Sequence, residues 1–316
     1  MTGARGWAAL LALGLVAGCA EEVAEPTPPP ERPVVEAPVD DPPPEGPVRS
    51  VQSELLAEYY ARLQRDLLSR GLLRGDGGGA DTPFTDVMLA RNFVRIALYD
   101  EYVPGAEISA GEPVMSRLRR WESPVRMDVR FGATVPAEQQ ARDRATIGAY
   151  AARLSRVTGL PITQGAVGAN YTVFVVNEDE RLALGDQLRA AAPGIGDQTV
   201  RTIVNMPRSV LCLVVAFSEG GSPVYTRAIA VIRGEHPDLL RSACVHEELA
   251  QGLGLANDHP QARPSIFNDD EEFGLLTRHD ELLLKILYDD RLRPGMSPTE
   301  AAPIVSVIAT ELMGGA

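Results

Sequence analysis

The order of strand-like and helix-like patterns along the chain is the feature that most restricts its fold. The segment VRMDVRF, residues 125–131, alternates apolar and polar side chains, which is the pattern of a half-buried strand. Further strands are predicted at 171–176, 210–217 and 226–233, and helices at 51–70, 85–99, 136–157, 178–191, 278–289 and 298–312, with one more around His246. This mixture predicts an α+β fold, in which a small mixed sheet packs against long helices.

The N-terminus has the pattern of a secreted protein. The opening MTGARGWAALLALGLVAGC contains one arginine, an apolar run and then small residues, which predicts a signal peptide over residues 1–18. The stretch from Leu15 to Cys19 resembles a bacterial lipobox, in which cleavage leaves the cysteine as a diacylated N-terminus. The alternative is an ordinary signal peptide that is cut near Ala20. Because no aspartate follows Cys19, the outer membrane is the favoured site of a lipoprotein that faces the periplasm.

Residues 19–48 are rich in proline and acidic side chains. Such a segment is expected to stay disordered, and at about 3.1 Å per residue it would reach up to about 90 Å from the membrane. The rest divides into a helical segment and glycine-rich loop at 49–81, a main domain at 82–293 and a C-terminal helix at 294–316. Whether the helix at 51–70 packs on the domain or projects toward another protein stays open. The formal charge of −13 argues against nucleic acid as a partner.

Two cysteines remain once Cys19 carries the lipid, and they are Cys212 and Cys244. An even pair outside the cytoplasm predicts one disulfide, and the alternative is two buried free thiols. Since Cys212 lies on a predicted strand and Cys244 on a predicted helix, the bond would tie that helix to the sheet.

The stretch CVHEELAQGLGLANDH, residues 244–259, is similar to the zinc-binding pattern HExxHxxGxxH. Counted from His246, the pattern fails, because alanine and leucine occupy the second ligand position and the glycine position. Counted from Glu247, it aligns Glu247 and Gln251 with ligands, Glu248 with the general base and Gly254 with the glycine. Asp258 is taken as the third ligand. Oxygen donors of this kind favour magnesium, calcium or manganese over zinc.

The segments around this stretch resemble a matrixin-type metzincin domain between about residues 117 and 292. PSIFND, residues 264–269, is similar to the turn under the metzincin site, with Ser265, Phe267 and Asn268 in it and Phe267 at the methionine position. LLTRHDELLLKILYDDRL, residues 275–292, is similar to the following helix. The wording HEELAQGLG, SIFNDDEEF and LLLKILYDDRLRPGM is also similar to that of a bacterial lipoprotein domain family of unknown function. The resemblance implies a metzincin-like scaffold without the zinc-binding imidazoles.

Three functions are compatible with these residues. The favoured one is a non-catalytic envelope lipoprotein that binds a peptide, glycan or protein in the cleft. The second is an atypical metallopeptidase with Glu248 as general base on a water held by an unusual divalent cation. The third is a structural envelope assembly component, in which Gln251 and Asp258 hydrogen-bond the turn at 265–268. In all three, the expected partners are the membrane, through the lipid, and an envelope protein or peptide.

The four histidines are not expected to be ligands. His246 points away from Glu247 around the helix and is interpreted as a surface or packing residue. His259 is expected to be solvated in a loop, and the alternative is that it reaches a metal if the loop bends. His236 and His279 are interpreted as structural.

Overall fold

The computed structural model describes residues 47–100, 114–268 and 270–314, without the side chain of Asp100. The predicted signal peptide, Cys19 and nearly all of the predicted stalk therefore lie outside the described residues. Within the described ranges, no helix is both long enough and apolar enough to cross a membrane.

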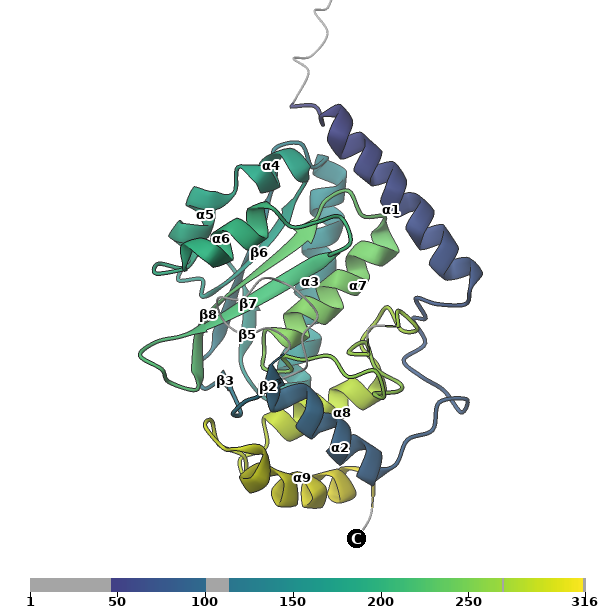
Figure 1. Cartoon of the computed structure of the whole chain (residues 1–316), viewed down its shortest axis with the longest axis vertical. Coiled ribbons are helices and arrows are strands. Elements are labelled where there is room, and N and C mark those ends of the chain that lie inside the picture. The colour runs from purple at the N-terminus through teal and green to yellow at the C-terminus, as the bar shows by residue number, and fades with distance from the viewer. Residues whose placement is uncertain (1–46, 101–113, 269, 315–316) are drawn as a thin grey trace, which may run out of the picture. The chain divides into compact units, whose positions relative to one another are not determined.

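A mixed sheet forms the centre of the fold, as predicted (Figure 1). Its parallel strands lie in the order β3 (Arg120–Trp121), β8 (Val224–Arg233), β6 (Tyr171–Val176), β4 (Val125–Phe131) and β5 (Ile162–Gln164). β7 (Cys212–Ser218) pairs antiparallel with β8. β1 (Tyr99–Asp100) and β2 (Val114–Met115) form a separate antiparallel pair.

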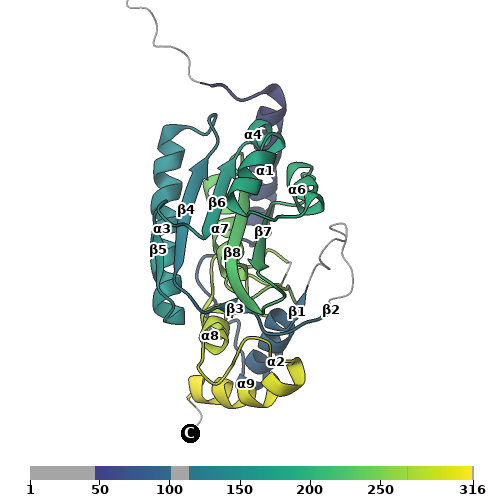
Figure 2. The ribbon, with the colours of Figure 1, turned by 90° about the vertical axis from the view of Figure 1, so that its left-hand side faces the viewer.

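Helices cover both faces of the sheet (Figures 1 and 2). Alternation along β6 explains this arrangement, because Val173 and Val175 enter one core cluster and Phe174 and Val176 enter another on the opposite face. The first cluster joins the sheet to α2 (Asp86–Ala97), α3 (Ala137–Thr158), α7 (Asp238–Gln251), α8 (Arg278–Leu287) and α9 (Pro298–Leu312). The second joins it to α5 (Gly185–Ala191) and α6 (Asp197–Val204), next to the short α4 (Glu178–Leu182).

The helix predicted at 178–191 is two helices, α4 and α5. The chain leaves the helix at Ala183 and Leu184, and Leu184 is fully buried in the second core cluster. Burial of this side chain outweighs the local helical preference, because one buried leucine contributes about 1.5–3 kcal/mol. The sequence analysis also missed α6 and the three-residue strand β5.

The first helix, α1 (Val51–Ser69), packs on the domain, which decides the question that the sequence left open. Leu56 and Tyr60 form an apolar cluster with Leu240 of α7. Ser53 Oγ donates a hydrogen bond to a carboxylate oxygen of Glu235 at 2.8 Å, and both residues are buried. Both apolar and polar contacts therefore fix α1 to the domain.

Candidate functional site

Helix α7 carries most of the residues of the predicted site. It begins after Pro237 and packs on β7 and β8, with Cys244 in the middle of its length. A disulfide joins Cys244 to Cys212, the first residue of β7, with the two Cα atoms 5.9 Å apart. The predicted disulfide is confirmed, and it ties α7 to β7.

His246 is a packing residue and not a candidate ligand. Its ring stacks on Tyr150 with centroids 3.9 Å apart, and its Nδ1 accepts a hydrogen bond from the backbone N–H of Leu276 at 2.9 Å. Burial, and then the charge of Arg153, lowers the pKa of His246 to about 3. The imidazole is therefore neutral at physiological pH, and one of its nitrogens is already bonded.

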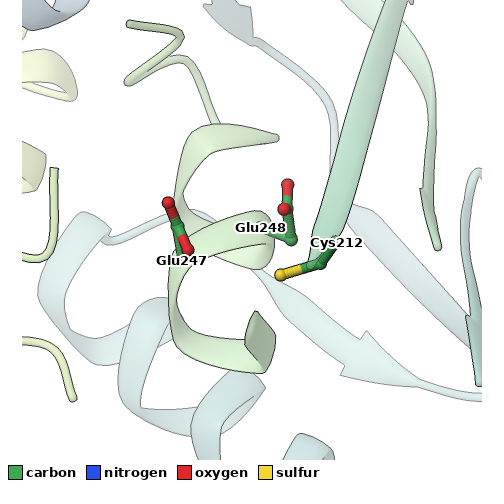
Figure 3. A group of neighbouring side chains, drawn as sticks. All are labelled: Cys212, Glu247 and Glu248. Atoms are coloured by element: carbon green, nitrogen blue, oxygen red, sulfur yellow. The ribbon is translucent and has the colours of Figure 1, made fainter. Parts of the chain in front are cut away.

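Glu247 and Glu248 meet Cys212 at the junction of α7 and β7. One oxygen of each carboxylate and the Cys212 sulfur lie within 4.8 Å of one another. Figure 3 shows Glu248 between α7 and the start of β7, with Glu247 on the adjoining face of the helix. Glu248 is 4% exposed, whereas Glu247 is only partly buried. Because the Cys212 sulfur is part of the disulfide, it offers no thiolate to a metal.

The surroundings of Glu248 include a buried tyrosine. The Tyr171 hydroxyl donates a hydrogen bond to the Glu248 carbonyl at 2.8 Å. Burial raises the pKa of Tyr171 well above its usual value, and the negative charge of Glu248 raises it further. This tyrosine is therefore a neutral donor that anchors the helix and is not a proton source at neutral pH.

Gln251 and Asp258 lie at the C-terminal end of α7. The Gln251 side-chain amide donates to the Asp258 carboxylate at 3.3 Å. Strict motif spacing from Glu247 puts the last ligand position at residue 257, so Asp258 is one residue too late in the count. Asn257 is 2% exposed, and its amide donates to the Arg95 carbonyl at 2.9 Å. It therefore fastens this loop to α2.

Gly254 occupies the position where the motif requires a glycine. Its φ of +128° lies outside the range that other residues adopt readily, and a Cβ atom there would clash with the Arg119 carbonyl oxygen. The need for glycine therefore comes both from the backbone angle and from the close approach of the segment before β3.

The turn at Ser265 to Asn268 lies in the core, where Phe267 is fully buried. Asp280 of α8 holds it, because the Ser265 hydroxyl donates to this carboxylate at 2.6 Å and the Ile266 N–H donates at 3.2 Å. The sequence analysis predicted a turn here but did not identify Asp280 as its anchor.

Comparison with known proteins adds a family. A profile described as "Protein of unknown function (DUF2927)" matches residues 86–307. The chain belongs to this family. No match was found among curated proteins or among solved structures. The DUF2927 match runs from the start of α2 into α9, so α1 lies outside it although it packs on the same domain.

The remaining histidines of this DUF2927 protein differ in their burial. His236 is 2% exposed, and burial, followed by the charges of Arg233 and Arg241, lowers its pKa well below the usual value. His279 is fully buried beside Asn92, with 3.1 Å between the Asn92 amide nitrogen and its Nε2. His259 is only partly buried, and burial is also the main cause of its lowered pKa.

Proposed function

We propose that this DUF2927 protein is a lipid-anchored protein of the bacterial envelope that binds an extended, basic peptide segment along β7 and does not cleave it. The observation that carries the proposal is the pair of carboxylates, Glu247 and Glu248, at the first residue of β7. The proposed binding surface runs from this pair along β7 to the other end of the strand.

A metzincin-like scaffold is part of this proposal, and the order of elements supports it. The antiparallel strand β7 precedes β8, then the site helix α7, the buried turn at 265–268 and the helix α8. The last three of these parts follow one another in the order that the resemblance implies. In such a scaffold, the fold and the chemistry are separate inferences, because a scaffold can keep its cleft after its metal ligands have changed.

Strand β7 offers a peptide a place to bind. β8 is the strand that pairs with it in the described part of the chain, so the opposite edge of β7 ends the sheet. Both faces of β7 are packed, since Val214 and Ala216 contact one core cluster and Leu213 and Phe217 contact the other. Backbone N–H and C=O groups at such an edge can hydrogen-bond an added strand.

The carboxylate pair selects the charge of the peptide. Two carboxylates this close repel one another, and a cationic group placed near them lowers their energy. The partial burial of the pair strengthens this attraction, because it is screened less than on an open surface. A lysine or arginine side chain, or a free amino terminus, fits this place.

The ligand set does not fit zinc catalysis. Gln251 and Asp258 bond to each other, His246 uses one ring nitrogen for Leu276, and the Cys212 sulfur is oxidised. A zinc ion at neutral pH prefers imidazole and thiolate, and the aligned positions present neither. Binding without hydrolysis is therefore better supported than the metallopeptidase alternative.

Affinity selection tests the proposal. The purified full chain is incubated with a synthetic library of randomised octapeptides, and mass spectrometry identifies the retained peptides. We expect retained peptides to be intact and enriched in one basic group. The Glu247→Gln, Glu248→Gln double variant should lose this enrichment, whereas Glu138→Gln, which removes an exposed carboxylate on α3, should keep it. Retention without any preference for basic groups, or cleavage of the peptides, would refute the proposal.

A further inference from the structure

The far end of β7 has the opposite charge character from its start. A surface pocket of about 580 Å³ opens where β7 ends, and Ala216 and Ser218 of that strand line it. Arg117 and Arg119, from the segment before β3, line it as well. In a chain with a formal charge of −13, two arginines in one pocket form a local exception.

The two arginines are held in different ways. Arg117 is exposed, and its guanidinium donates to the Gly295 carbonyl at 3.0 Å, a partner that carries no net charge. Arg119 is partly buried and hydrogen-bonds the side chain of Tyr225, whose pKa is raised by burial and lowered in part by the charge of Arg119. Because an arginine side chain is charged at physiological pH, both residues place a positive group beside the pocket.

Polar groups add to the pocket. The Ser218 hydroxyl oxygen is shielded from solvent and has no hydrogen-bond partner among the described residues. Such a buried hydroxyl gains free energy when a ligand bonds to it. Ser297 and Pro298, at the positive end of α9, also line the pocket. The Glu300 carboxylate, in the first turn of α9, accepts hydrogen bonds from the backbone N–H and the hydroxyl of Ser297 at 2.8 Å and 2.7 Å.

Strand β7 itself connects the acidic pair with the arginine pocket. Cys212, Val214, Ala216 and Ser218 follow one another at every second position of β7, and the seven residues of the strand span about 20 Å at about 3.3 Å per residue. The acidic pair lies at the Cys212 end and the arginine pocket at the Ser218 end. An extended peptide of seven or eight residues can reach both.

We infer that the pocket binds the C-terminal carboxylate of the peptide. The bound peptide would then run parallel to β7, with its cationic group at Glu247 and Glu248. This inference rests on the proposed function and names the peptide class more closely. Guanidinium groups bind carboxylates in a fork geometry, and charge-assisted hydrogen bonds of this kind are stronger than neutral ones. An acidic side chain near the end of the peptide is the other source of the same group.

The test uses the octapeptide library in two forms, one with free C-terminal carboxylates and one with C-terminal amides. The full chain should retain the carboxylate form at least about tenfold better than the amide form, the effect expected from one charge-assisted hydrogen bond. Arg117→Gln, Arg119→Gln and Ser218→Ala should each lower this ratio while leaving the preference for a basic group intact. Arg156→Gln, an exposed arginine on α3 beside the opposite sheet edge, should change neither.

The outcomes separate the two proposals. A ratio near one in the unaltered protein, or a ratio that Arg117→Gln and Ser218→Ala leave unchanged, overturns the carboxylate pocket even where the basic preference persists. Amidated peptides that are retained because they end in aspartate or glutamate assign the carboxylate to a side chain. Retention of no peptide at all overturns both proposals. Thermal unfolding checks that each variant is folded, and Arg117→Gln, on an exposed side chain, carries the test if Arg119→Gln does not fold.

Discussion

Replacing Cys212 and Cys244 together by alanine should destabilise the domain and loosen the proposed binding strand. The bond closes a loop with a sequence separation of 32 residues. The chain-entropy relation gives about 12 cal/mol/K for a loop of this length, or about 3.7 kcal/mol at 25 °C. For a domain of this size that corresponds to a fall in Tm of about 7–15 °C. Both cysteines are buried, so lost packing adds to the effect.

Guanidinium unfolding of the unaltered and the double-alanine proteins measures the difference, with dithiothreitol-treated unaltered protein as a second comparison. Retained octapeptides should also bind the variant more weakly, because β7 is no longer fixed against α7. A change in the free energy of unfolding below about 1 kcal/mol would refute the argument, since it would mean that the packing of β7 and α7 alone holds the junction. Unchanged peptide affinity would show that the bond does not shape the binding surface.

Further predictions concern stability. The folded-state pKa of His246 is about 3 against an ordinary 6.5, so protonation favours the unfolded state and stability is lost as pH falls through that window. His246→Phe keeps a ring on Tyr150 but cannot be protonated, so it should remove up to about 1.4 kcal/mol per pH unit from the pH dependence of the free energy of unfolding. Denaturant unfolding between pH 4 and 7 measures this dependence, and an unchanged dependence in the variant would contradict the prediction. Gly254→Ala should lower the free energy of unfolding by about 3 kcal/mol or more, because this residue has a positive φ and its new Cβ atom would clash with the Arg119 carbonyl oxygen. Gly159→Ala is the control, because Gly159 has a φ of +72° but no atom lies within 4 Å of the added Cβ, and it should lower the free energy of unfolding by only about 1 kcal/mol. Equal losses in the two variants would show that the contact with the Arg119 carbonyl does not matter.

Much of the fold could be predicted because it is encoded locally. The strands at 125–131 and 171–176 and the helix at 298–312 begin and end where their periodicity and caps place them. The break between α4 and α5 could not, because it depends on the burial of Leu184 against residues distant in sequence. β5 could not either, because its three residues form a strand only by pairing with β4.

The candidate site divides in the same way. The disulfide was predicted from an even pair of cysteines in the expected compartment, and it is confirmed. The helical direction predicted that His246 is a surface or packing residue, and it packs on Tyr150. The anchoring of the turn by Asp280 joins residues 15 positions apart and left no local signal. The arginine pocket was also missed, because Arg117 and Arg119 meet Ser218 only through the arrangement of the sheet, although SRLRR at 116–120 is a basic cluster in an acidic chain.

Hydrogen exchange along β7 is the most direct test of the central claim that this strand binds a peptide without cleaving it. Amide exchange is measured by mass spectrometry for the full chain alone and with a saturating retained octapeptide, and the mass of the peptide is read at the end. The account predicts slower exchange in residues Cys212–Ser218, together with a peptide of unchanged mass. Unchanged exchange in β7 with protection elsewhere, or a cleaved peptide, would contradict it.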